Sequence, residues 1–163
     1  MFMIKYSDIF DHHVQIPTVT SLKAFHLILF PDRYAICRLE PGDSLPPWIN
    51  HEGFLSITHT TEELSIVCQE AIIPPAIPCQ AGWHMLKFEG TFDFSQTGVL
   101  ASVTLPLAEA GISILAISTY NTDYVLIQTG QLEQAIQVLQ EAGHTLQYPG
   151  DCYVPEYQAT SPT

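Results

Sequence analysis

The order of hydrophobic patterns in residues 83–148 constrains the fold more than any other feature of this sequence. Apolar residues at every second position, or in short continuous runs, predict strands, whereas spacings of three and four residues predict amphipathic helices. The patterns predict a strand at 84–90, a helix at 98–110, strands at 112–119 and 123–128, a helix at 131–142 and a strand at 144–148. We expect Pro106 to kink the first helix or to end it early, because proline removes a backbone hydrogen bond. The order is therefore β-α-β-β-α-β.

This order is that of ferredoxin-like domains, which have one antiparallel sheet with two helices on one face. The first half contains apolar runs without a clear helical pattern, so we expect a strand-rich relative of the same unit with degenerate helices. Its runs at 22–30 and 34–39 flank Pro31-Asp32-Arg33 and predict a hairpin, and the runs at 54–58 and 64–69 predict another. Both halves place a threonine-rich acidic turn between two apolar strands, which favours a tandem duplication.

A proline-rich segment separates the two halves. Pro74, Pro75 and Pro78 remove backbone donors and bias the preceding residues away from helix. We therefore predict an α+β fold of two tandem ferredoxin-like (βαββαβ) units. The predicted organisation is an N-terminal extension at 1–20, a first unit at 21–70, a linker at 71–82, a second unit at 83–148 and a C-terminal tail at 149–163.

The charge balance excludes several classes of partner. Seventeen Asp and Glu against five Lys and Arg give the 163-residue chain a formal net charge of −12, and such a surface repels nucleic acid and anionic membranes. No apolar run approaches the length of a membrane span, and the first residues lack the basic and apolar regions of a signal peptide. We therefore expect a cytoplasmic protein without nucleic-acid or membrane partners, whose four cysteines are reduced thiols.

The sequence lacks the common motifs for catalysis and for metal or cofactor binding. It has no G-x-S-x-G, P-loop or G-x-G-x-x-G motif, and its seven histidines include no i, i+4 pair. His51-Glu52 begins like a zinc-protease motif, but Leu55 stands where the second histidine would be. We predict no catalytic residue, no metal site and no cofactor. A small hydrolase or a metal-binding protein is the less favoured alternative.

Three motifs in the second half resemble those of a known family. They are Gly98-Val-Leu-Ala-Ser, then Pro106-Leu-Ala-Glu-Ala-Gly-Ile-Ser113, then Ile117-Ser-Thr-Tyr-Asn-Thr-Asp-Tyr-Val-Leu-Ile127. With them, residues 83–148 resemble ACT domains, and most closely the CASTOR-type subfamily; residues 22–69 resemble it less completely. The resemblance implies paired ACT units, each a ferredoxin-like βαββαβ unit, that bind an amino acid at their interface and regulate without catalysis.

The resemblance also implies an assembly. Eukaryotic CASTOR-type proteins act as arginine sensors and carry more ACT units than this chain has room for. An equivalent pairing of units here would therefore require a homodimer. Because the chain carries no attached catalytic or DNA-binding domain that the sequence reveals, any regulated protein would be a separate partner in trans.

The first candidate ligand-binding segment is the start of the helix at 98–110. Unpaired backbone N–H groups and the helix dipole favour a carboxylate there, and Gly98 lets a ligand approach the backbone closely. By resemblance, Thr97, Gly98 and Val99 occupy the loop that grips the ligand in several ACT domains. The alternative for the hydroxyls is ordinary helix capping by Ser95 or Thr97.

The second candidate segment is the strand that follows this helix. By resemblance, Ser113 and Ile114 match the strand edge that CASTOR-type proteins use for backbone contacts to the ligand. The alternative is that both residues serve sheet and dimer packing alone.

The third candidate segment is the turn after that strand. Asp123 could hold an ammonium or guanidinium group through charge-assisted hydrogen bonds, with Asn121 and Thr122 beside it. By resemblance, this segment contributes both ligand and partner-protein contacts, and we assign Tyr120 to partner binding. The alternative is an Asx-type turn in which these side chains satisfy local backbone groups.

A site between a helix start and Asp123 would suit a zwitterion, which an amino acid is, and the acidic chain favours a cationic one. We therefore predict a non-catalytic amino-acid sensor whose ligand is coupled to dimerisation or to partner binding. A ligand-free protein–protein interaction module is the alternative, because exposed strand edges also form dimers.

Overall fold

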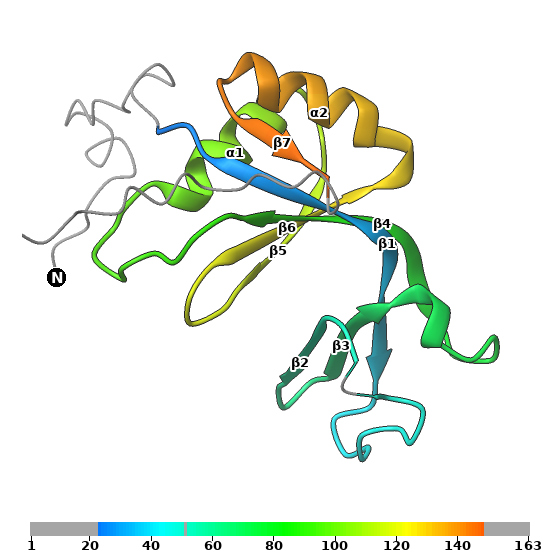
Figure 1. The fold of residues 1–163 in the computed structure, drawn as a ribbon. Coiled ribbons are helices and arrows are strands. Elements are labelled where there is room, and N and C mark those ends of the chain that lie inside the picture. The colour runs from blue at the N-terminus through cyan, green and yellow to red at the C-terminus, as the bar shows by residue number, and fades with distance from the viewer. Residues whose placement is uncertain (1–22, 51, 149–163) are drawn as a thin grey trace, which may run out of the picture.

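The computed structural model describes residues 23–50 and 52–148, so the extension at 1–20 and the tail at 149–163 lie outside the described residues. Within them the chain is an α+β protein with a seven-stranded sheet and two α-helices (Figure 1). The strands are β1 (His26–Leu39), β2 (Leu55–His59), β3 (Leu64–Gln69), β4 (Cys79–Phe88), β5 (Ile114–Ser118), β6 (Asp123–Gln128) and β7 (Thr145–Gln147). The helices are α1 (Val99–Glu109) and α2 (Leu132–Glu141), with short 3₁₀ turns η3 (Glu70–Ile72) and η4 (Thr129–Gln131).

The strand order places β1 and β4 at the centre of the sheet. The path runs β2-β3-β1-β4-β6-β5, and all neighbours on it are antiparallel. β7 lies beside the N-terminal part of β1 and runs parallel to it. Both helices cover one face of the sheet beside β4 and β6, whereas β2 and β3 lie toward the other end of β1 (Figure 1).

The second half follows the predicted order of elements. β6 has the predicted bounds, and α1 and α2 lie inside the segments predicted as helices. Apolar residues from the two helices and from one face of β1, β4 and β6 form the largest buried cluster. Its buried members are Phe25, Leu27, Leu29, Leu86, Phe88, Val99, Val103, Leu107, Ile112, Val125, Ile127, Ala135 and Leu139. Burial of this face, about 25 cal/mol per Å² of apolar surface, is what holds the helices on the sheet.

The predicted hairpin at 22–39 is wrong, because this segment is the single long strand β1. Pro31 cannot donate to a strand ladder, and such a residue is tolerated at a bulge. The pairing with β4 indeed shifts between Leu29 and Arg33. Pro31-Asp32-Arg33 is therefore an irregular, exposed stretch within one strand and not a chain reversal.

β4 also differs from the prediction, because it begins at Cys79, inside the segment predicted as a linker. A second register shift in the β1–β4 pairing lies between Tyr34 and Ile36 of β1, opposite Gly82. Gly82 has φ 80°, a conformation that glycine adopts without steric cost. The Glu70 carboxylate accepts a hydrogen bond from the Gly82 amide at 3.0 Å. This bulge lets the start of β4 continue the pairing with the far end of β1.

The last strand does not pair with the first strand of its own unit. β7 instead pairs with β1, His26 facing Thr145, so the N-terminal part of β1 lies between β7 and β4. The sheet of the second half thus contains a strand that comes from the first half. Pattern alone does not reveal such an exchange, because both strands carry the same apolar alternation.

Two smaller apolar clusters lie along the rest of β1. One contains Tyr34, Trp83, Met85 and Leu126, with Phe54 and Tyr124 against it, on the sheet face opposite the helices. The other contains Cys37, Leu64, Ile66 and Cys68, covered by residues of the segments 48–49 and 72–77. The first half therefore has its own small core, which is built without an α-helix in the described residues.

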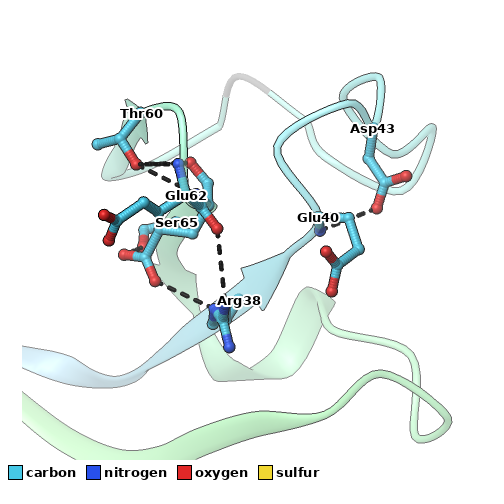
Figure 2. A network of polar contacts seen from close by, with 7 residues as sticks. Arg38, Glu40, Asp43, Thr60, Glu62 and Ser65 are labelled. Atoms are coloured by element: carbon cyan, nitrogen blue, oxygen red, sulfur yellow. Dashed lines mark hydrogen bonds and ion pairs between the residues drawn. The ribbon is translucent and has the colours of Figure 1, made fainter.

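An ion pair fixes the far end of β1 to the β2–β3 turn. Arg38 Nε lies 3.1 Å from the Glu63 carboxylate, and the Arg38 guanidinium also donates to the Glu62 carbonyl at 3.5 Å (Figure 2). The Thr60 hydroxyl accepts hydrogen bonds from the Glu62 and Glu63 amides, which closes the turn. Because Arg38 is largely exposed, this pair orients the hairpin more than it stabilises it.

Pro106 does not end α1, which continues to Glu109. A proline at this position leaves the carbonyl of Ser102 without its helical donor. His144 supplies the missing donor, since its Nε2 lies 3.0 Å from the Ser102 oxygen. The Phe25 amide donates to His144 Nδ1 at 3.1 Å, so the buried ring is neutral with its proton on Nε2.

No helix among the described residues is both long and apolar enough to cross a membrane.

We predict that His144→Ala lowers the free energy of unfolding by about 2–4 kcal/mol, because two buried backbone groups lose their partner. Urea denaturation measures the loss. His59→Ala is the matched control, since His59 bonds the Pro41 carbonyl at an exposed position. In a Pro106→Ala background, the new amide can bond to Ser102, so the same substitution should cost less. Equal losses in both backgrounds would contradict the proline–histidine compensation.

Candidate ligand-binding site

A small hollow lies between the start of α1 and the turn that joins β5 to β6. Its volume is about 190 Å³. The segment before α1 and the turn after β5 supply its walls. The lining residues are Phe92, Asp93, Phe94, Gln96, Val99, Ser118, Thr119, Tyr120, Asn121, Thr122 and Asp123. The hollow thus brings together two segments that are separated in sequence by a whole helix and a strand.

The β5–β6 turn is held by threonine side chains. The Thr119 amide and hydroxyl both donate to the Thr122 carbonyl, at 2.9 and 2.8 Å. The buried Thr122 hydroxyl donates to the Phe88 carbonyl at the end of β4, at 2.8 Å. The turn is therefore fixed both internally and to the central part of the sheet.

One backbone hydrogen bond ties the opposite wall to this turn. The Phe92 amide donates to the Asn121 carbonyl at 2.9 Å. Downstream, Asp93 accepts hydrogen bonds from the Ser95 amide and hydroxyl at 2.8 and 2.6 Å. These bonds stabilise the loop in one shape before α1 begins. The protein's own hydrogen bonds thus hold both walls of the hollow.

Helix α1 presents an uncapped start to this region. Gly98 is the N-cap residue with φ 80°, and no side chain caps the helix. The predicted alternative of capping by Ser95 or Thr97 is therefore wrong, and Ser95 bonds to Asp93 instead. Uncapped backbone N–H groups at a helix start attract an anion.

The side chains around the hollow combine acids with aromatic rings. The hydrogen bonds from Ser95 hold the pKa of Asp93 below its ordinary value, so this carboxyl is ionised at neutral pH. Asp123 lies on the other wall. The rings of Phe94 and Tyr120 meet edge to face at 5.3 Å between centroids, and each ring is 79% exposed. Exposed aromatic pairs beside acids suit a cationic group.

The structure brings some of the predicted residues together and leaves others apart. Val99, Asn121, Thr122, Asp123 and Tyr120 line the hollow. Thr97 and Gly98 come between two lining residues in sequence without being among them.

Ser113 and Ile114 lie apart from the hollow, because they precede or begin β5, whose opposite end, Ser118, lines it. Thr122 has a structural role, since its buried hydroxyl donates to the Phe88 carbonyl of β4. The alternative for Asp123 was an Asx-type turn, but the side-chain hydrogen bonds to the backbone within this turn come from Thr119.

Sequence reasoning missed most of the wall that precedes α1. Phe92, Asp93, Phe94 and Gln96 line the hollow but were not candidates. The signal available was the alternation of two aromatic residues about an acid in Phe92-Asp-Phe94, between the predicted strand and the predicted helix. Exposed apolar residues that gather into one patch, unlike single ones, mark interaction sites, and Phe94 meets the exposed Tyr120 ring.

A larger hollow, of about 500 Å³, lies between the β2–β3 hairpin and β5. Its apolar lining includes Ile36, Val67, Leu115 and Ile117. Both flanking strands, β2 and β5, are the outer strands of the sheet path. Among the described residues, no cluster of His, Cys, Asp and Glu could hold a metal ion.

Comparison with known proteins identifies the second half of the chain. A family model described as an ACT domain matches residues 79–141. The chain belongs to the ACT domain family. Within that family it is CASTOR-like, because it is 31% identical over 96 residues to the cytosolic arginine sensor for mTORC1 subunit 1 of Rattus norvegicus. A separate model of an N-terminal domain matches residues 32–76.

The alignments with individual relatives cover different shares of those proteins. The aligned region is 53% of this chain but 29% of the rat sensor, so the chain spans less than a third of that relative. A crystallised protein from Agrobacterium tumefaciens is 38% identical, with a TM-score of 0.73 over 77% of this chain and 94% of that chain.

The aspartokinase alpha and beta subunits share the fold at 17% identity, with a TM-score of 0.53 over 74% of this chain and 99% of that chain. This likeness agrees with a ferredoxin-like ACT fold for the chain.

We predict that substitutions in the walls of the hollow differ in their effect on the free energy of unfolding. Thr122→Val should lower the free energy of unfolding by about 1 kcal/mol, because it removes the bond to Phe88. Phe94→Ser and Tyr120→Ser should each change it by less than about 0.5 kcal/mol, as exposed positions do. Urea denaturation of the three variants measures this. A large loss for either aromatic variant would show that the pair serves stability instead of binding.

Proposed function

We propose that this protein is a non-catalytic regulatory sensor that binds a free amino acid in the hollow between the start of α1 and the β5–β6 turn. The observation that carries the proposal is that an uncapped helix start and two acids, Asp93 and Asp123, border the same hollow. Opposite charges in one small site match a zwitterion. Membership of a family of regulatory domains supports the same function.

The proposed binding mode uses each wall differently. The α-carboxylate would accept hydrogen bonds from the first N–H groups of α1, beginning at Val99. The ammonium would lie toward Asp123, as a charge-assisted pair. Phe94 and Tyr120 would cover the ligand side chain, and their rings together with Asp93 favour a cationic side chain. The net charge of −12 acts in the same direction.

The volume of the hollow supports a site that is completed by a second copy of the chain. A volume of about 190 Å³ falls below the range of about 300–1,000 Å³ of typical ligand pockets. A second wall would complete the site, and we propose that a second copy of the chain supplies it. Thr97, Gly98, Ser113 and Ile114 stay candidates for that ACT–ACT interface. Because such a ligand would contact both copies, binding would favour the dimer by mass action.

The named relatives supply the remaining parts of the proposal. The rat relative is by name a cytosolic arginine sensor for mTORC1. We propose the same compartment for this chain, and a regulated protein in trans that contacts Tyr120 at the exposed tip of the turn. Arginine is the first ligand to test, with lysine and citrulline as its cationic and uncharged counterparts.

A ligand-free interaction module is the second candidate. The outer strands β2 and β5 flank a hollow of about 500 Å³ with a mixed polar and apolar lining, and free strand edges recruit other chains. This candidate predicts partner binding that is indifferent to amino acids.

We predict that a thermal-shift screen of the twenty common amino acids gives stabilisation by a cationic one. At a hundred times the dissociation constant, a ligand adds about 2.7 kcal/mol, which corresponds to a rise in Tm of several degrees. Asp123→Asn should weaken the effect at least tenfold in ligand concentration. Glu141→Gln is the matched control, because it removes one negative charge at the exposed end of α2.

Two further results decide between the candidates. Gly98→Ala should weaken ligand binding, because φ 80° strains any side chain there. Light scattering with and without the ligand should show a shift toward dimer. The absence of stabilisation by any amino acid would favour the interaction module, and a strictly monomeric protein at saturating ligand would remove the intersubunit site.

A further inference from the structure

Two cysteines face each other across the central strands of the sheet. Cys37 of β1 and Cys79 of β4 are directly paired in the antiparallel register. Opposed residues in such a pair have Cα atoms about 4.5–5.5 Å apart and side chains on the same face, and disulfides span about 4.4–6.8 Å between Cα atoms. The register therefore places these two cysteines within the range of Cα separations that a disulfide spans.

The two thiols are close neighbours. Cys79 lies near enough to Cys37 to raise the pKa of its thiol, and both are free thiols. Cys68 lies near them: it is in the same buried cluster as Cys37, but its strand partner on β1 is Ala35. Cys68 is thus diagonal to Cys37, at about 7–8 Å for such neighbours. The directly opposed pair is the better placed for a bond.

The two thiols differ in access to solvent. Cys79 is exposed and Cys37 is fully buried. Burial, together with the nearby Cys68 and Cys79 thiols, raises the pKa of Cys37 to about 12. Only the thiolate reacts readily with oxidants, so a soluble oxidant would reach and oxidise Cys79 first. Cys37 would then act as the resolving thiol, since it lies against Cys79.

We propose that Cys37 and Cys79 form a redox site that closes reversibly into a cross-strand disulfide in response to hydrogen peroxide. The Cys79 thiolate attacks peroxide, the O–O bond breaks, and Cys79 becomes a sulfenic acid while hydroxide leaves and takes up a proton as water. The Cys37 sulfur then attacks the Cys79 sulfur, its proton passes to the departing hydroxyl, and a second water leaves. Cys79 and Cys37 together lose two electrons, and peroxide is reduced to water. A dithiol reductant such as dithiothreitol reverses the step by thiol–disulfide exchange.

The bond would lock the junction of the two halves. It would close a loop from Arg38 to Pro78 that contains β2, β3, η3 and the proline-rich segment. The start of β4 is exposed over Cys79, Gln80 and Ala81 and precedes the Gly82 bulge. A covalent link there restricts the unfolded chain and raises stability. The site lies on different elements from the proposed ligand hollow, so its test is independent of the proposed function.

The test treats the full chain with hydrogen peroxide, blocks remaining thiols, and maps peptides without reduction. In a Cys152→Ser background, which keeps three of the four cysteines, we expect free thiols to fall from three to one, with a peptide linking Cys37 to Cys79. We also expect a Tm raised by several degrees, which dithiothreitol reverses. The chain carries Cys152 outside the described residues, so Cys152→Ser is used as the background.

Three variants sharpen the result. Cys79→Ser is exposed and should prevent the crosslink without affecting folding. Cys37→Ala should leave a Cys79 sulfenic acid that dimedone traps. If this variant does not fold, the peptide map of the protein with Cys37 intact still tests the crosslink. Cys68→Ala is the matched control and should still crosslink. A Cys37–Cys68 link, a disulfide between two chains, or sulfinic acid at Cys79 without a crosslink would each overturn the proposal.

Discussion

The length of β1 is the constraint on which the rest of the structure depends. One strand of fourteen residues carries Leu27 and Leu29 into the core beneath the helices and Cys37 into the small core of the first half. β3, β4 and β7 pair with β1, and β6 pairs with β4. The outer strands β2 and β5 are joined to the sheet by pairing with β3 and β6. The irregular stretch around Pro31 and the Gly82 bulge let these two strands stay paired through both halves. The two halves are therefore joined by a shared strand ladder and not by a connecting segment alone.

The ligand hollow and the thiol pair occupy opposite ends of this framework. The hollow depends on a few directional hydrogen bonds, among them Thr122 to Phe88 and Phe92 to Asn121, which hold its two loops in place. Such preorganisation lowers the entropy lost on binding. The thiols instead depend on strand register, which places Cys37 opposite Cys79. β4 contributes to both features: its last residue, Phe88, is bonded to the turn beside the hollow, and its first residue, Cys79, is paired with Cys37.

Much of the fold was predictable because periodic burial leaves a direct trace in sequence. The segments of α1, α2 and β6 were located from their apolar spacing. The hairpin at 22–39 was not, since a proline-containing turn and a proline-containing bulge have the same local composition. Nor was the role of His144, whose partners Phe25 and Ser102 are more than forty residues away in sequence. Long-range compensation for Pro106 is invisible to any local pattern.

For the candidate site, sequence pointed to Val99, Asn121, Thr122 and Asp123 and left out Asp93 and Phe94. Motif and resemblance identify segments, but the packing of the loop before α1 decides which residues share a hollow. By itself the sequence determined the class of fold, the ACT family resemblance and the acidic character, because these depend on composition and periodicity. Only the tertiary structure decided that β1 serves both halves, that β7 pairs with it, and that Cys37 meets Cys79. Strand partners are chosen by which surfaces bury each other, and that choice is made between segments that are distant along the chain.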